Sequence, residues 1–196
     1  MSIYEICIVI HVLGWVFWLG TDIGVLVGAK VSERADLGVE ARLTVLQLAM
    51  VLDRAPRFAV SIVWFTGVVL SQQLGYEIIP VTIAAPLALI WLFFTWGVIF
   101  NEPTTRLFRF SAIGQTVLYI AAIIGMGAGA SWLLYDGAMP LWMAIKWYGF
   151  VLVGIAAIAL EKLFAPVGAL FGELAVNGAS DDLNSRISTS LKPGSP

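Results

Sequence analysis

The chain contains 196 residues, of which 60% are hydrophobic and only 12% are charged, and its mean hydropathy is +0.91. Because water-soluble domains carry about one-quarter charged residues, this composition excludes an ordinary soluble domain and indicates an integral membrane protein. The net charge of −2 also argues against a nucleic-acid-binding protein, which needs a basic surface. In lipid, only α-helices and closed barrels satisfy their own backbone hydrogen bonds, so the long apolar runs predict an all-α membrane bundle.

Five apolar segments are predicted to cross the membrane, since about 20 apolar residues span the hydrocarbon core as a helix. Between the first two, residues 41–53 are apolar on much of their surface but charged at both ends, which predicts a helix at the cytoplasmic interface. We expect residues 1–162 to form one transmembrane domain, and residues 163–196 to form a cytoplasmic interfacial segment and a flexible tail. The predicted spans are residues 3–29, 58–75, 83–100, 110–135 and 140–160.

The distribution of lysine and arginine predicts the orientation of these spans. The second and fourth connections, YEIIPVT and DGAM, contain no basic residue. Because basic residues near helix ends stay on the cytoplasmic side, this alternation places the N-terminus outside and the C-terminus in the cytoplasm, which requires an odd number of spans. The basic residues outside the predicted spans are Lys30, Arg34, Arg42, Arg54 and Arg57 in the first connection, Arg106 and Arg109 in the third, and Lys162, Arg186 and Lys192 after the fifth span.

Small residues recur at four-residue spacing in the fourth predicted span, at Ala121, Gly125 and Gly129. Residues four apart lie on one stripe of a helix, and small side chains on such a stripe let a second helix approach closely. We therefore interpret this stripe as a helix-packing seam and not as a ligand site.

The only histidine of the chain, His11, lies in the first predicted span within the run HVLGWVFWLG. It shares one helical stripe with other polar and indole side chains, and we expect such a stripe to face protein rather than lipid. An ionisable residue inside a membrane span usually faces the bundle interior and marks a functional site. The residues of this stripe are Cys7, His11, Trp15, Trp18 and Asp22.

Lys146 is the only lysine inside a predicted span. In the predicted orientation it lies in the same outer half of the membrane as His11. Two interpretations stay open at this point. In one, the lysine side chain snorkels outward to the membrane interface; in the other, Lys146 and His11 converge on a common ligand between the first and fifth spans.

Three interpretations of His11 follow from these residue types. In the first, His11 is an axial ligand of heme b, Lys146 is the second axial ligand or pairs with a propionate, and indoles flank the macrocycle. In the second, soft ligands hold a copper ion. In the third there is no ligand, and His11 hydrogen-bonds a neighbouring backbone group or a glutamine. The flanking indoles are Trp15, Trp18 and Trp147, the copper ligands are Cys7, His11, Met139 and Met143, and the glutamines are Gln72, Gln73 and Gln115.

Asp22 is predicted to lie in the inner half of the first span, where a charged side chain costs about 2.5 to 3.5 kcal/mol on insertion scales. We therefore expect this carboxylate to have a partner. One interpretation is an ion pair with Lys30, Arg54 or Arg57, and the other is a role in proton relay.

The run HVLGWVFWLG, from His11 to Gly20, resembles the first helix shared by the copper-resistance CopD-like membrane proteins and the bacterial membrane protoporphyrinogen oxidases. RFSAIGQTVLYIAAIIGMGAGASWLL and MAIKWYGFVLVGIAAIALEK are similar to the last two helices of CopD-like domains. The resemblance covers most of the chain in layout and implies a helical bundle of the bacterial inner membrane that binds heme b through His11. The oxidases also use a lysine near the start of a later helix. Its positional match here is Pro86, so Lys146 would take that role only in a different helix arrangement.

Together these observations predict a membrane protein that takes part in heme-linked electron transfer or oxidises a membrane-accessible substrate, with quinone in the bilayer as the electron acceptor. The competing class is a non-enzymatic membrane subunit or a copper-handling protein. A homo-oligomer or a larger membrane complex is compatible with both classes. Bis-histidine ligation of heme would require a dimer, because each chain has one histidine.

Overall fold

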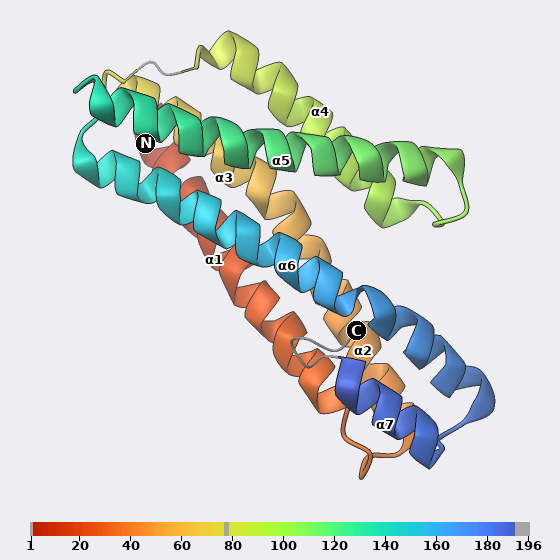
Figure 1. Ribbon diagram of the computed structural model, residues 1–196. Coiled ribbons are helices and arrows are strands. Elements are labelled where there is room, and N and C mark those ends of the chain that lie inside the picture. The colour runs from red at the N-terminus through yellow and green to blue at the C-terminus, as the bar shows by residue number, and fades with distance from the viewer. Residues whose placement is uncertain (1, 77–78, 191–196) are drawn as a thin grey trace. The chain divides into compact units, whose positions relative to one another are not determined.

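The computed structural model describes residues 2–76 and 79–190, and every regular element within these ranges is a helix (Figure 1). The predicted all-α fold is therefore confirmed for the described part of the chain. The helices are α1 (Ile3–Ser32), α2 (Val39–Leu52), α3 (Arg54–Gln73), α4 (Val81–Phe100), α5 (Arg106–Tyr135), α6 (Leu141–Asn177) and α7 (Asp181–Ser190).

Four of these helices, α1, α4, α5 and α6, are long and apolar enough to cross a membrane. They cover the first, third, fourth and fifth predicted spans. Many of their apolar side chains are exposed, as expected for helices that face lipid; Val16 and Phe17 of α1, for example, are 60% and 55% exposed. The prediction of several membrane-spanning helices thus agrees with the lengths and surfaces of the observed ones.

The second predicted span, residues 58–75, corresponds to α3, which is not among these four helices. α3 begins at Arg54, and polar side chains such as Ser61 and Thr66 are buried along its length. A helix that packs against protein needs less apolar surface than a helix that faces lipid, so composition alone does not mark α3 as a span. The number of five spans and the orientation of the termini stay predictions.

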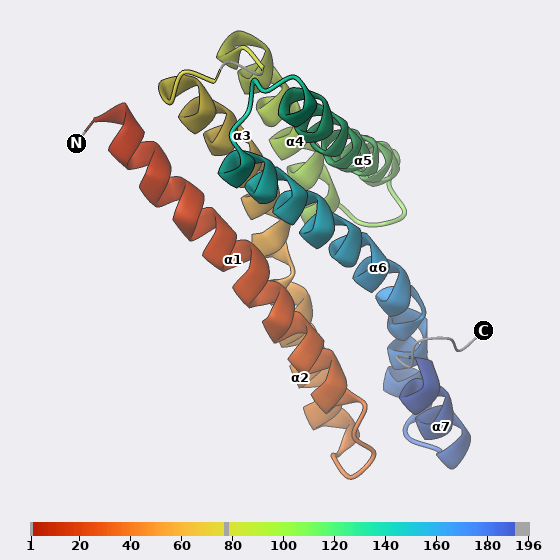
Figure 2. The ribbon, with the colours of Figure 1, turned by 60° about the vertical axis from the view of Figure 1, so that its left-hand side comes forward.

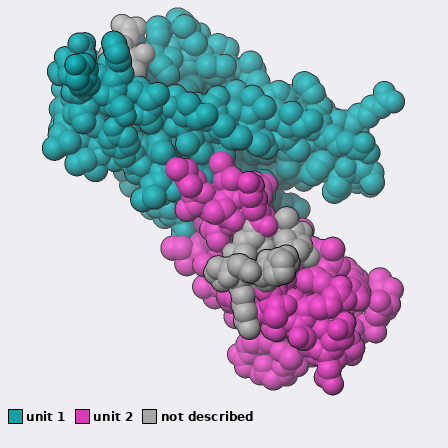
Figure 3. Space-filling model, viewed as in Figure 1, with its two compact units in different colours: residues 1–21, 54–154 teal, residues 22–53, 155–196 magenta. Residues whose placement is uncertain are grey.

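The chain divides into two compact units, which Figure 3 shows in different colours. Unit 1 comprises residues 1–21 and 54–154, and unit 2 comprises residues 22–53 and 155–196. The single transmembrane domain of residues 1–162 stays a prediction. The second parts of α1 and α6 build a separate hydrophobic core together with α2 and α7.

Within unit 1, α4 packs against both α3 and α5. The buried ring of Trp91 on α4 contacts Trp64 on α3, with ring centroids 6.2 Å apart, and Tyr119 on α5, with centroids 6.0 Å apart. Gln115 of α5 donates from Nε2 to Oγ1 of Thr95 on α4 over 3.3 Å. Such polar contacts stabilise helix pairs inside membranes, so the three helices share an interior with both aromatic and hydrogen-bonded contacts.

The small-residue stripe of the fourth predicted span is only partly packed in α5. A Cβ atom at Gly129 would lie 3.2 Å from Cζ3 of Trp147, so this glycine permits a close contact. Ala121 and Gly125 are exposed, and no neighbouring atom of the described chain lies within 4 Å of a Cβ built at Gly125. The predicted seam is therefore wrong for these two residues within one chain. Residue spacing identifies a stripe, but it does not show which helix faces it.

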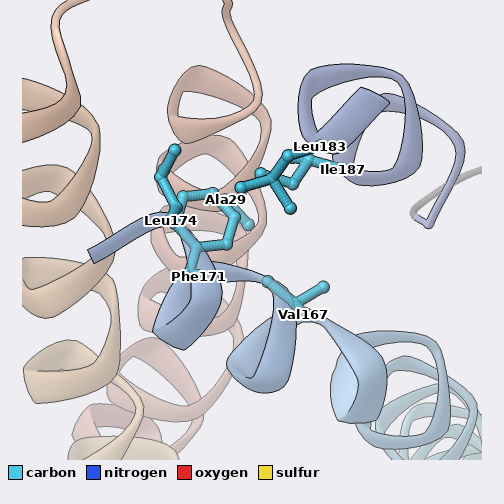
Figure 4. Close-up of a cluster of buried hydrophobic side chains, with 6 residues drawn as sticks. All are labelled: Ala29, Val167, Phe171, Leu174, Leu183 and Ile187. Atoms are coloured by element: carbon cyan, nitrogen blue, oxygen red, sulfur yellow. The ribbon is translucent and has the colours of Figure 1, made fainter. Parts of the chain in front are cut away.

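Unit 2 has its own hydrophobic core, shown in Figure 4. Leu174 and Ile187 have no exposed surface, and partly buried side chains of α2 pack against the same cluster. The helices of unit 2 are therefore joined by buried apolar side chains. The fully buried members come from three helices: Ala29 of α1, Val167, Phe171 and Leu174 of α6, and Leu183 and Ile187 of α7.

The C-terminal segment differs from the flexible tail that the composition predicts within residues 163–196. α6 continues to Asn177, and residues 181–190 then form α7. The last part of the predicted tail, residues 191–196, lies outside the described residues.

Local signals in the sequence account for α7. Ser180 accepts a hydrogen bond from the backbone N–H of Leu183 at its Oγ atom over 3.2 Å, which satisfies a free donor of the first helical turn. Aspartates at the next two positions interact favourably with the helix dipole. Leu183 and Ile187, four residues apart, then occupy the buried face. Residues 181–190 thus form a short amphipathic helix, which these local signals indicate although the composition of the segment is polar.

Arg42, one of the basic residues of the predicted first cytoplasmic connection, is fully buried in unit 2. Its Nε donates to the carbonyl oxygen of Ser32 and its Nη1 donates to Oδ1 of Asn184, each over 2.8 Å. Its Cζ atom lies 5.7 Å from the ring centroid of Phe171. Burial lowers the pKa of Arg42, because removal of water disfavours the charged form. The guanidinium, which belongs to α2, is thus hydrogen-bonded both to the end of α1 and to α7.

We expect Gly14→Ala to destabilise the packing of α1 against α3. The new Cβ would lie 2.6 Å from Cγ2 of the buried Val63, and such overpacking costs about 1 to 3 kcal/mol. The free energy of unfolding in mixed detergent micelles measures this effect. Gly20→Ala is the matched control, because no atom lies within 4 Å of a Cβ at that position. Adding Val63→Ala to Gly14→Ala is expected to recover part of the loss, and a loss that this addition leaves unchanged would contradict the assigned contact.

We expect Asn184→Ala to loosen α7, because it removes the acceptor for a buried, charged donor of Arg42. Hydrogen bonds to charged groups contribute about 1.5 to 3 kcal/mol, so the open form of α7 should become about tenfold or more populated. The rate of tryptic cleavage after Arg186, which lies within α7, measures this opening. Asn177→Ala changes an exposed asparagine and serves as the control. Equal cleavage rates for the two variants would disprove the role of Asn184.

Candidate functional site around His11

His11 lies on α1 and faces α3 within unit 1; both helices are labelled in Figure 2. The imidazole is half-buried and rests beside Gly67 of α3. A Cβ atom at Gly67 would lie 3.3 Å from Cε1 of His11, so the absence of a side chain there lets the ring approach the backbone of α3 closely. The prediction that this histidine faces protein is therefore consistent with its position.

Both ring nitrogens of His11 have partners within the chain. Nδ1 lies 3.0 Å from Oγ1 of Thr66, and the indole Nε1 of Trp15 donates to Nε2 over 3.2 Å. The Thr66 hydroxyl itself donates to the carbonyl oxygen of Ile62 over 2.7 Å. An indole N–H can only donate, so Nε2 must carry a lone pair. Because the Thr66 hydrogen is used by Ile62, Nδ1 must carry the proton, and the four groups form one directional chain of hydrogen bonds with a neutral imidazole.

Aromatic rings continue from this chain toward α6. The rings of Trp15 and Trp18 are stacked with centroids 5.0 Å apart, and Trp18 meets Phe150 of α6 edge to face with centroids 5.3 Å apart. Trp18 is almost completely buried, whereas Trp15 is half-buried. The predicted polar and indole stripe of α1 therefore includes a packed aromatic wall next to the imidazole. We call His11, Trp15, Thr66 and Gly67 the His11 site.

Lys146 is exposed on α6, and its Nζ atom lies 4.8 Å from the ring centroid of Trp142, one turn nearer the start of the helix. A cation over an indole ring is a favourable contact. The direction toward the start of α6 matches the snorkelling interpretation of this lysine. Convergence of Lys146 and His11 on a common ligand stays a prediction.

The methionines of the predicted copper set belong to a hydrophobic core of unit 1. Met139 and Met143 are each 3% exposed and pack with Ala130 and Ala144. Cys7 is a half-buried free thiol on α1. Among the described residues, no three histidine, cysteine, aspartate or glutamate side chains come together as a metal site. The copper set stays a prediction, and core packing explains the two methionines without it.

Asp22 belongs to unit 2, whereas the His11 site belongs to unit 1. The carboxylate is half-buried and interacts with other groups of the protein, as the cost of an unpaired carboxylate in this position requires. The choice between an ion pair and a proton relay stays open.

A shallow apolar hollow of about 330 Å³ is lined by residues of α1 and α3 in unit 1. It contains neither His11 nor any charged side chain, so it offers apolar contact but no ligand atom for a metal. The lining residues are Ile10, Leu13, Gly14, Phe17, Ala55, Phe58, Ala59 and Ile62.

Sequence reasoning missed the partner of His11 on α3. The interpretation without a ligand predicts a neighbouring backbone group or a glutamine. Gln115 donates to Thr95 instead, and the side-chain partner of the imidazole on α3 is Thr66. The signal in the sequence is the pair Thr66–Gly67 within the apolar run IVWFTGVVL, because a small and a polar residue together are typical of helix contacts in membranes. The glutamines of α3, Gln72 and Gln73, are exposed.

Comparisons of the chain with protein-family models, with curated proteins and with solved structures find no match. The assignment to the CopD-like and protoporphyrinogen oxidase group therefore stays a prediction that rests on the residue patterns around His11 and in α5 and α6.

We predict that ¹⁵N NMR of the protein labelled in histidine shows one neutral imidazole with its proton on Nδ1. The hydrogen-bond directions require this tautomer, because Trp15 and Thr66 determine the role of each nitrogen. The chain has one histidine, so the spectrum needs no assignment variants. A proton on Nε2, or a doubly protonated ring at neutral pH, would contradict the hydrogen-bond chain.

Proposed function

We propose that the protein is a multi-pass protein of the bacterial inner membrane that binds heme b through His11 and takes part in membrane electron transfer or in oxidation of a membrane-accessible substrate. The observation that carries this proposal is the oriented lone pair on Nε2 of His11. It results from the 3.0 Å contact between Nδ1 and Thr66, which leaves Nε2 as the basic nitrogen.

The residues of the His11 site would suit a histidine that holds heme iron. Histidine ligands usually donate their second N–H to a protein acceptor, which fixes the ring orientation and raises the basicity of the ligating nitrogen. Thr66 is such an acceptor, and its own hydroxyl is fixed by Ile62. Trp15, Trp18 and Phe150 supply flat apolar rings close by. To hold iron through Nε2, His11 would give up the hydrogen bond that it accepts from the indole of Trp15.

Heme bound at this site would supply a one-electron carrier, with a potential set by its ligands and surroundings. Lys146 would provide a cation for a propionate from the exposed surface of α6, where its ammonium already lies near Trp142. Quinone dissolved in the bilayer is the electron acceptor that suits a carrier in this location. In this scheme Thr66 positions the imidazole, and the aromatic rings limit access of water to it.

We further propose five spans, with the N-terminus outside and α3 as the second span. Its 20 residues extend about 30 Å as a helix, which matches the hydrocarbon core. Its buried hydroxyls donate within the helix: Ser61 to the carbonyl of Phe58 and Ser71 to that of Gly67, each over 2.9 Å. Polar groups satisfied in this way are compatible with a helix inside a membrane.

A non-enzymatic membrane subunit is the second candidate. The observation that favours it is that Trp15 and Thr66 already satisfy both nitrogens of His11, so the imidazole has a structural role without any ligand. In this case the hydrogen-bond chain serves to hold α1 against α3.

Cysteine labelling in intact cells tests the topology. In a Cys7→Ser background, we expect Ser2→Cys to react with a membrane-impermeant maleimide from outside, and Ser188→Cys to react only after the membrane is opened. Ser2 and Ser188 are both exposed, near the two ends of the described chain. Labelling of both positions from the same side would indicate an even number of spans, with α3 outside the set.

A visible spectrum of the detergent-purified protein tests heme binding. We expect a Soret band and a reduced α-band, and loss of both in His11→Gln. Glutamine offers an amide N–H and a carbonyl oxygen to Thr66 and Trp15, so this variant is expected to fold, and its retained melting temperature is the control. Heme retained by His11→Gln would contradict the assigned ligand. A colourless wild-type protein obtained in good yield would contradict heme binding and leave the non-enzymatic membrane subunit as the remaining candidate.

A further inference from the structure

We infer that the indole N–H of Trp15 competes with heme iron for the lone pair on Nε2 of His11 and is displaced when iron binds; we call Trp15 the cap of His11. Thr66 is the positioning residue, because its contact with Nδ1 keeps the lone pair on Nε2. The competition with heme rests on the proposed function. The cap itself rests only on the hydrogen bonds of the His11 site.

The two partners of His11 differ in what holds them. Thr66 is 5% exposed and lies on another helix, and its Oγ1 is fixed by the donation to Ile62. Trp15 is half-buried and lies one turn from His11 on the same helix. The indole and imidazole planes are inclined by 77°, so the indole approaches through its edge with the N–H foremost. The bond to Thr66 is therefore the fixed one.

Trp15 keeps other contacts if its hydrogen bond to His11 is lost. Its ring is stacked on Trp18 and meets Phe150 edge to face, with centroids 6.4 Å apart. The N–H belongs to the rigid indole, so its departure from Nε2 requires the ring to shift against Trp18 and Phe150. Displacement would thus cost one hydrogen bond and a rearrangement of these aromatic contacts.

The hydrogen bond from Trp15 also explains how an imidazole without a ligand is tolerated inside a membrane. An unsatisfied polar atom in an apolar setting is costly, and the indole N–H removes that cost at Nε2. The same bond lowers the apparent affinity for any ligand of Nε2, because the ligand must replace it. The two neighbours of His11 therefore act on ligand binding in opposite directions.

Hemin titration of the full-length protein in detergent micelles tests this inference, with the Soret absorbance as readout. We expect Trp15→Phe to bind hemin about threefold to tenfold more tightly, because the competing hydrogen bond is gone while the ring stays. Thr66→Val should bind about tenfold to a hundredfold more weakly, whereas Thr66→Ser should remain close to wild type. Trp132→Phe, at a 68% exposed position of α5, is the matched control.

Weaker hemin binding by Trp15→Phe than by wild type would overturn the inference, because Trp15 would then hold the cofactor and not compete with it. Thr66→Val and Thr66→Ser with equal affinity would overturn the positioning role of Thr66. Either result leaves heme binding by the wild type, and so the proposed function, in place.

The ¹⁵N spectrum of His11 without heme provides the readout that is independent of the cofactor. We expect Trp15→Phe to shift the Nε2 resonance and Thr66→Val to change the balance of tautomers. If neither the wild type nor any variant binds hemin, the proposed function fails. The spectra still test whether the indole of Trp15 donates to Nε2 of His11. An Nε2 resonance that is identical in wild type and Trp15→Phe would overturn the cap.

Discussion

The contact between Nδ1 of His11 and Oγ1 of Thr66 joins α1 and α3 through polar groups within apolar runs of both helices. In lipid, a polar side chain that lacks a partner is costly, so this contact fixes how α1 is rotated about its own axis. One side of α1 then turns Trp18 inward, while Val16 and Phe17 remain exposed. The hydrogen bond to Thr66 and the packing of Trp18 against Phe150 thus agree on which side of α1 faces protein.

Glycines make this contact compatible with close helix packing. The absence of a side chain at Gly67 lets the imidazole lie against the backbone of α3. Gly14, almost one turn further along α1, lets this helix lie close to Val63. The close approach strengthens the hydrogen bond to Thr66, because it holds donor and acceptor at 3.0 Å. The packing also defines the roles of the two ring nitrogens: Nδ1 lies against Thr66, and Nε2 accepts a hydrogen bond from the indole of Trp15.

Unit 2 contains a buried charged side chain, Arg42, whereas the His11 site of unit 1 contains a neutral imidazole. Arg42 is buried among apolar side chains and is held by the carbonyl of Ser32 and the amide of Asn184. The third nitrogen of the guanidinium, Nη2, is buried and has no hydrogen-bond partner among the described residues. A buried charge with an unsatisfied donor is costly, so these contacts specify which helices meet more than they add net stability. The C-terminal helix is thereby part of the folded structure.

The sequence by itself determined the helical class and four apolar helices, because hydropathy and length are local properties that every lipid-facing span must show. It also placed His11 on a stripe with Trp15 and Trp18, because that stripe depends only on the helical repeat. The partner of His11, the burial of Arg42 and the packing of α7 were decided by tertiary structure. Thr66 and Asn184 lie 55 and 142 residues away from the groups they bind, and no local pattern encodes which distant residue will face a given helix.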